Sequence, residues 1–90
     1  MKRLSSPTVK LAAKQIGENL ATWRKLYNLT SQQLADKAAV SRATISRLEN
    51  GDPKVSFKTF LNVCRALSSL DAVVEATDPY ETDYGRVRAD

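Results

Sequence analysis

The stretch LTSQQLADKAAVSRATISRLENG, residues 29–51, decides the fold. Thr30 or Ser31 can cap a short helix, and Ser41 can cap a second one after a break at residues 39–40. The sequence Asn-Gly-Asp-Pro at residues 50–53 ends the second helix, because these residue types favour turns. Two short helices joined by a tight break and followed by a longer packing helix are typical of a helix-turn-helix. The stretch therefore predicts an all-α domain.

The second short helix is expected to present a slim, cationic face to solvent. At about 100° per residue, its apolar residues Ile45 and Leu48 lie almost opposite the flank that carries the arginines. That flank consists of four residues: Arg42, Ala43, Ser46 and Arg47. Small side chains let a helix approach base edges in the major groove, and arginine can donate two hydrogen bonds to guanine. The alternative is that both arginines only solubilise a surface helix, but slimness, position and charge together favour DNA.

Longer helices are expected on either side of this pair. Ser6 and Pro7 fit the N-cap and first position of a helix that runs to about residue 27. Its apolar residues recur at helical spacing and are expected to be buried: Ile16, Leu20, Trp23 and Tyr27. Asn28 is placed to end this helix, because Asn tolerates the left-handed conformation.

A fourth helix is expected to open at Ser56. Its predicted buried stripe has five members: Phe57, Phe60, Leu61, Cys64 and Leu67. After Leu70, residues 71–77 favour a short fifth helix over a strand through 72–74, where paired valines suit extended structure. We therefore predict a compact domain of four or five helices, with a short C-terminal strand as the alternative. Residues 1–6 are interpreted as an N-terminal arm, 7–77 as the domain and 78–90 as an acidic, flexible tail.

Charge is distributed unevenly along the chain. Residues 1–65 carry twelve Lys or Arg against four Asp or Glu, whereas residues 66–90 carry two against six. The net charge of +4 conceals this division. A basic body suits a polyanionic partner such as nucleic acid, although charge alone also fits a solvated surface.

Composition narrows the chemistry. The chain has no histidine and a single cysteine, Cys64, whose helical spacing from Leu61 and Leu67 places it in the core. We expect no catalytic residues, no metal site, no cofactor and no enzymatic activity. No apolar run approaches the roughly 18 residues of a transmembrane segment, and the first residues lack the apolar centre of a signal peptide. The expected location is the cytoplasm.

Residues 14–70 resemble the helix-turn-helix domains of the phage Cro and repressor type, also called the XRE family. The resemblance rests on a Leu-Thr pair at 29–30, a Gln near the start of the first short helix, Leu-Ala at 34–35, Val-Ser at 40–41, Ile-Ser at 45–46 and Glu-Asn-Gly at 49–51. It implies a Cro/repressor-like fold and a sequence-specific DNA-binding transcriptional regulator, with repression as the expected outcome.

The resemblance also assigns roles to individual residues. In the family, certain positions contact base edges or the adjoining phosphates. Five residues of this chain occupy those positions: Ser41, Arg42, Ala43, Ser46 and Arg47. Phosphate contacts are implied for four more: Ser31, Gln32, Asn50 and Lys54. The first two of these fall at a helix N-terminus, which favours anions in any case.

Other positions match structural features of the family. Arg24 and Glu49 correspond to an internal salt bridge, the alternative being two ordinary exposed charges. Ala35 corresponds to the small residue where the two short helices cross, with Val40 in the core beside Ile45 and Leu48. Two positions depart from the pattern, since Ala39 and Asn28 stand where the family usually has Gly. If residue 39 needs a positive φ, Ala adds a strain of about 1 kcal/mol.

One helix-turn-helix covers only one half-site. The expected partner is therefore double-stranded DNA, bound by a homodimer on a palindromic operator. The acidic end, DPYETDYGRVRAD, resembles the ends of HipB-like antitoxins and implies a HipA-like kinase toxin as a second partner. The alternative is a stand-alone or prophage regulator without a toxin.

Functions of other classes fit the sequence less well. A protein-interaction adaptor that kept the fold would carry acids or bulky apolar residues on the second short helix, and this helix has neither. Membrane association through the first helix is disfavoured, because the apolar residues it would need are expected to lie in the core: Ile16, Leu20 and Trp23. RNA binding is disfavoured because few aromatic residues are free to stack on bases.

Overall fold

The regular elements of the protein are all helical, which confirms the predicted all-α class. The structure is a computed structural model that describes residues 6–88, and no strand occurs among them. The elements are α1 (Pro7–Leu26), α2 (Ser31–Ala38), α3 (Arg42–Glu49), α4 (Phe57–Ala66), α5 (Leu70–Ala76), the 3-10 helix η1 (Pro79–Glu81) and α6 (Asp83–Arg88). The predicted N-terminal arm, residues 1–6, lies outside the described residues except for Ser6.

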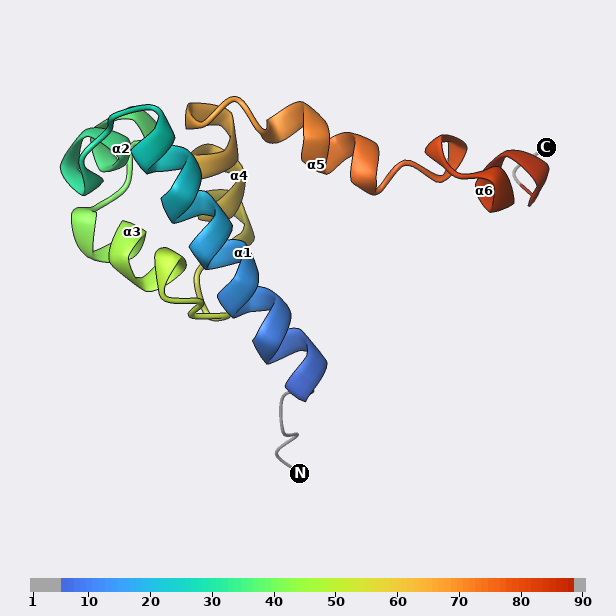
Figure 1. The fold of residues 1–90 in the computed structure, drawn as a ribbon, viewed down its shortest axis with the longest axis horizontal. Helices are drawn as coiled ribbons and strands as arrows, with labels where there is room; N and C mark the ends of the chain where they lie inside the picture. The colour runs from blue at the N-terminus through green and yellow to red at the C-terminus, as the bar shows by residue number, and fades with distance from the viewer. Residues whose placement is uncertain (1–5, 89–90) are drawn as a thin grey trace.

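The first four helices form a body, and the rest of the chain leaves it as an arm (Figure 1). In the body, α2 packs on α3 and α4, and α1 packs on α3. The arm consists of α5, η1 and α6, residues 70–88. Because of the arm, the radius of gyration is 15.1 Å, against about 12 Å for a compact domain of this length.

Side-chain caps fix where the helices begin. Thr30, one of the two expected caps of α2, accepts a hydrogen bond from the Gln33 amide at 3.0 Å, while Gln33 Oε1 accepts from the Thr30 amide at 2.8 Å. This reciprocal pair satisfies two N–H groups that the helix leaves unpaired. Three other helices begin at the serines that the sequence indicated as caps: Ser6, Ser41 and Ser56.

The core lies where α1 to α4 meet. Its largest fully buried side chains come from α2, α3, α4 and the residue after α4: Leu34, Ile45, Val63, Cys64 and Leu67. Ala35 is fully buried, as expected of the small residue between the two short helices, and Val40 packs against the core from the turn. Burying the apolar side of α3 in this way leaves its opposite side for solvent.

Burial of the long helices differs from the prediction. In α1 the predicted stripe contributes only Leu20 to the core, whereas Ile16, Trp23 and Tyr27 are 43%, 45% and 47% exposed. In α4 the first residue of the predicted stripe, Phe57, is 71% exposed. The prediction that these residues are buried is therefore wrong for a single chain. The reason is that only α5, of the chain after α4, borders the hollow of Ile16, Trp23 and Tyr27, whereas η1 and α6 project away from the body (Figure 1).

A close approach sets the position of α3 on α1. Gly17 is buried in the middle of α1, and a Cβ atom there would lie 2.5 Å from the Leu48 carbonyl oxygen and 2.7 Å from that of Glu49. Both are backbone atoms, which cannot rotate away. Gly17 was not predicted from the sequence to be a contact residue, although a glycine inside an otherwise regular helical pattern can be a sign of close packing.

The turn between α2 and α3 requires a left-handed residue. Ala39 has φ 57° and ψ 42°, so the strain expected for Ala at this position is present. Asn28 has φ 59°, consistent with its expected role after α1. These two positions allow three helices to follow one another within the body with very short connections.

The regular structure of the arm is entirely helical. Residues 70–76 form α5, the helix that was favoured over a strand. Residues 79–88, in which the sequence shows turn residues and no period, form η1 and α6. Gly85 is buried against η1, where a Cβ atom would collide with the Pro79 carbonyl group.

Candidate nucleic-acid interface

The outward side of α3 is slim and positively charged, as the helical wheel predicts. Ile45 is fully buried and Leu48 is 7% exposed. The residues of the opposite flank are all exposed: Arg42, Ala43, Ser46 and Arg47. Only the two arginines carry long side chains on this flank, so a flat surface could approach the helix backbone closely between them.

Ser41 starts α3 and keeps its hydroxyl occupied. Its Oγ accepts from the Thr44 amide at 3.1 Å and lies 2.7 Å from Thr44 Oγ1. Such a cap stabilises the helix by about 1 kcal/mol. Ser41 therefore holds the first turn of α3 in shape, and only the remaining hydrogen-bonding capacity of its hydroxyl is available to a ligand.

The two arginines of α3 differ in their surroundings. Arg47 Nε lies 3.4 Å from Asp52 Oδ2, and the Arg47 side chain is 57% exposed. Arg42 forms no ion pair with any of residues 6–88. Asp52 was not singled out from the sequence; the available signal was an acid five residues after Arg47 in the turn that ends α3. Of the two cations, Arg42 is the one that is free to meet an anionic ligand without breaking a contact.

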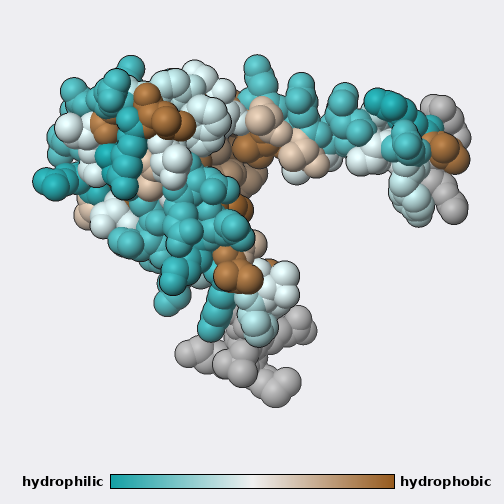
Figure 2. All heavy atoms as spheres, in the orientation of Figure 1, coloured by the Kyte–Doolittle hydropathy of each residue, from teal (hydrophilic) through white to brown (hydrophobic). Residues whose placement is uncertain are grey.

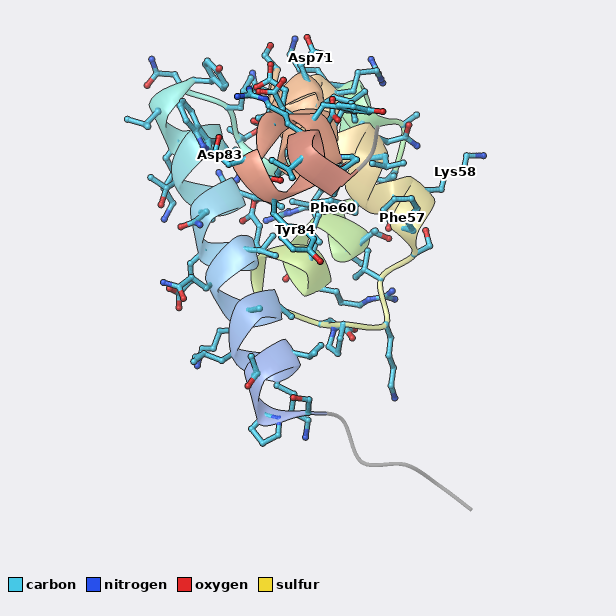
Figure 3. The ribbon with its side chains drawn as sticks, turned by 90° about the vertical axis from the view of Figure 1, so that its right-hand side faces the viewer. Phe57, Lys58, Phe60, Asp71, Asp83 and Tyr84 are labelled. Atoms are coloured by element: carbon cyan, nitrogen blue, oxygen red, sulfur yellow. The ribbon has the colours of Figure 1, made fainter. Side chains whose placement is uncertain are left out.

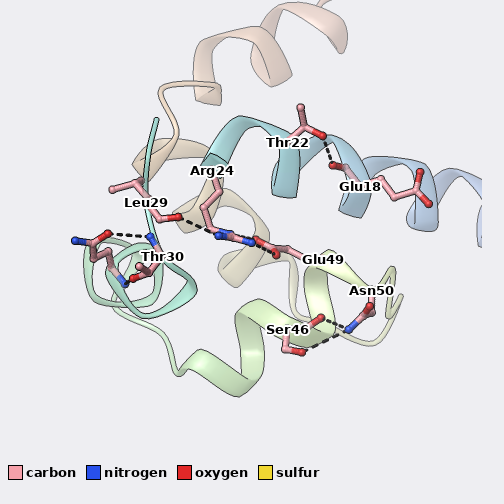
Figure 4. A network of polar contacts seen from close by, with 9 residues as sticks. Glu18, Thr22, Arg24, Leu29, Thr30, Ser46, Glu49 and Asn50 are labelled. Carbon is pink, nitrogen blue, oxygen red and sulfur yellow. Dashed lines mark hydrogen bonds and ion pairs between the residues drawn. The ribbon is translucent and has the colours of Figure 1, made fainter. Parts of the chain in front are cut away.

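A partly buried ion pair fixes the far end of α3 to the rest of the body (Figure 4). Arg24 Nε and Nη2 donate to the two carboxylate oxygens of Glu49 at 2.8 and 3.1 Å, and Arg24 Nη1 donates to the Leu29 carbonyl at 2.9 Å. The two side chains are only 13% and 14% exposed. The hydrogen bond with Glu49 raises the pKa of the Arg24 guanidinium above its ordinary value. The pair that the family resemblance implies is thus an internal clamp between α1, α3 and the loop before α2.

The four residues expected at phosphates lie on two segments that flank α3. Ser31 and Gln32 occupy the first two positions of α2, and Gln32 Nε2 donates to Asp36 Oδ1 at 2.9 Å. Asn50 follows α3, and its Nδ2 donates to the Ser46 carbonyl at 2.8 Å (Figure 4). Lys54 is exposed on the loop, and its backbone N–H donates to Asp52 Oδ1 at 2.9 Å. Gln32 Nε2 has a second N–H that a phosphate could accept from, whereas the Asn50 amide already faces two acceptors on Ser46. The Lys54 ammonium is accessible.

Other kinds of site can be checked in the described part of the chain: metal sites, a reactive thiol and membrane spans. Residues 6–88 contain no group of three or more His, Cys, Asp or Glu that could hold a metal ion. Cys64 is 1% exposed, and burial raises the pKa of its thiol, which favours the less reactive protonated form. None of the helices in this range is long and apolar enough to cross a membrane.

Comparisons with known proteins point to the same motif. The family described as Helix-turn-helix matches residues 20–71. The uncharacterized HTH-type transcriptional regulator YqaE of Bacillus subtilis (strain 168) is 36% identical over 59 residues, which cover 64% of this chain and 51% of that protein. The chain thus spans about half the length of this relative. The comparison with solved structures gives no match.

Proposed function

The chain belongs to the XRE-type helix-turn-helix family of DNA-binding transcription regulators, and from this premise we propose that it is a repressor that reads a palindromic operator as a dimer. α3 enters the major groove with its slim flank towards the bases. Arg42 and Arg47 supply the donors that distinguish guanine, and Ala43 and Ser46 leave the space for the approach. The proposed site of action is the cytoplasm.

One observation carries this proposal above the others. The only long side chains on the exposed flank of α3 are two arginines, and the opposite side of the same helix is sealed in the core by Ile45 and Leu48. A helix whose apolar side is buried in this way can enter the DNA major groove without losing its packing against the core. An adaptor surface would need acids or bulky apolar groups on this flank, and α3 has none there.

Contacts to the DNA backbone complete the proposed complex. The first turn of α2 places Ser31 and Gln32 beside the N–H groups of a helix start, which suit a phosphate. Lys54 and Asn50 lie on the other side of α3, at the loop that follows it. Such contacts position the protein, whereas the residues of α3 provide the sequence preference.

A selection from a random pool of DNA duplexes tests the proposal. The expected result is an enriched sequence with two-fold symmetry and half-sites about one helical turn apart, roughly 10 base pairs. An unsymmetrical enriched site would contradict the dimer, and failure to enrich any sequence would contradict sequence-specific binding. The partnership with a HipA-like kinase stays a prediction from the acidic end of the chain; it requires that a tagged copy, expressed with its neighbouring genes, co-purifies with a kinase.

A further inference from the structure

An uncovered apolar groove runs along α1 and α4. One hollow of about 520 Å³ is lined by residues of α1, α4 and α5, among them Trp23, Tyr27 and Val73. A second hollow of about 350 Å³ extends towards the loop before α4 and includes Phe57. The two hollows share Ile16 and Phe60, so they form one continuous strip, which we call the α1–α4 groove.

The exposure of this groove needs an explanation. Ile16, Trp23 and Tyr27 recur at the spacing of a buried helix face, yet each is more than two-fifths exposed. Trp23 and Tyr27 stack on each other with ring centroids 5.8 Å apart, which fills part of the space but leaves both rings partly open to solvent. A contiguous apolar surface of this kind on a small domain marks a place where another apolar surface binds.

The arm carries a complementary apolar surface. Its most exposed apolar residues are Val74, Tyr80, Tyr84 and Val87, at 60%, 51%, 73% and 77%. Figure 2 shows hydrophobic groups on the underside of the arm and at its far end, as well as along α1 in the angle between body and arm. The arm points away from the body, so its far end does not reach the groove of its own chain (Figure 1).

The end of the arm is folded into a defined shape. The Asp78 side chain caps the amide of Tyr80 at 2.9 Å, and Thr82 Oγ1 accepts from the Gly85 amide at 3.0 Å. Arg86 Nε donates to the Tyr80 carbonyl, and Gly85 sits directly against Pro79. A segment that already has its bound shape loses less conformational entropy on docking than a disordered one.

Charge favours docking of the arm on a body. Residues 70–88 carry five Asp or Glu against two Lys or Arg, whereas residues 6–69 carry ten Lys or Arg against four Asp or Glu. Figure 3, seen from the side of the arm, shows Lys58 next to Phe57 on α4. Asp83 directly precedes Tyr84 in α6. An acidic arm and a basic body attract each other, and the attraction guides the orientation in which they meet.

We propose that two copies of the chain exchange arms, so that η1 and α6 of each copy lie in the α1–α4 groove of the other. The same pair of surfaces is used twice about a two-fold axis, which closes the assembly at two copies. The inference rests on the dimer of the proposed function and gives its interface. It does not depend on DNA binding, because self-association is measurable without DNA.

The test measures the dimer dissociation constant of the full chain by analytical ultracentrifugation, with Val87→Asp in the arm and Phe57→Asp in the groove. Phe57 is the first residue of α4 and exposed, so an acid there suits the helix N-terminus and leaves folding intact. Each variant is expected to weaken the dimer at least tenfold. The control Leu11→Asp changes an equally exposed apolar residue of α1 outside both hollows and should leave the dimer unchanged. Circular dichroism melting checks that each variant is folded.

Mixing the two variants adds a stricter test. A Val87→Asp chain has an unchanged groove, and a Phe57→Asp chain has an unchanged arm. A dimer of one copy of each therefore has one of its two interfaces unchanged. We expect the mixture to associate more tightly than either variant alone. A wild-type chain that is monomeric, a dimer indifferent to both substitutions, or a mixture no tighter than its parts would overturn the arm exchange.

Binding to the selected operator separates this inference from the proposed function. If Val87→Asp leaves the dimer intact while operator binding persists, the arm exchange is wrong and the repressor stands. If the arm exchange is found but no operator is selected, the interface stands and the repressor is wrong.

Discussion

Arg47 of α3 pairs with Asp52 in the loop that follows this helix, with Nε 3.4 Å from Oδ2. The second cation of the α3 flank is therefore held by an acid of the same loop that carries Lys54. An exposed pair of this kind is worth about 0 to 1 kcal/mol, which is small enough for a nucleic-acid partner to break. We therefore expect Asp52 to lower the affinity of the α3 flank for DNA without preventing binding.

Replacing Asp52 by Asn releases this arginine. Asn keeps an oxygen that can accept from the Lys54 amide and removes the competing charge. We expect operator affinity to rise by up to about fivefold at low salt, since at most about 1 kcal/mol is recovered. Titration by fluorescence anisotropy measures this change, and the same substitution in an Arg47→Ala background should have a smaller effect. Weaker binding of Asp52→Asn would mean that Asp52 positions Arg47 for DNA.

Ala39→Gly is expected to stabilise the fold by about 1 kcal/mol, because residue 39 has a positive φ and Gly adopts it without a Cβ penalty. Urea unfolding followed by circular dichroism measures the difference in free energy. The matched control is Ala12→Gly on the exposed side of α1, where the same change should destabilise by about 1 kcal/mol. Equal destabilisation at both sites would show that the left-handed turn is not required.

Gly17→Ala is expected to destabilise the fold by about 1 to 3 kcal/mol, although Ala favours a helix by about 1 kcal/mol over Gly. The added Cβ would meet the backbone carbonyls of Leu48 and Glu49, and α3 would have to move away from α1. Urea unfolding gives the stability, and operator titration at a temperature where the variant is folded gives the effect on α3. A variant as stable as the parent would contradict the close contact.

The local structure of the body could be predicted from sequence because its signals are local. Serine caps, a turn residue in place of Gly and the opposition of the arginine-bearing flank of α3 to Ile45 and Leu48 each depend on only a few neighbouring residues. The wheel also predicted correctly which side of α3 is buried, since both apolar residues of that helix fall on one side.

Other features depend on what lies far along the chain. The period of Ile16, Trp23 and Tyr27 shows which side of α1 is apolar, but not whether the chain itself covers that side. Residues 79–88 form short helices held by side-chain caps and by the contact of Gly85 with Pro79, and these leave no apolar period to detect. The pairing of Arg47 with Asp52 depends on the path of the loop after α3.

The most direct test of the account concerns Arg42, the unpaired arginine of α3. Arg42→Ala should weaken binding to the selected operator by about 1 to 3 kcal/mol, roughly 5- to 160-fold, and change binding to a scrambled duplex far less. Lys10→Ala, which removes one charge from the first turn of α1, serves as the control and should affect both duplexes alike. Equal losses on operator and scrambled DNA for Arg42→Ala would contradict base reading by α3.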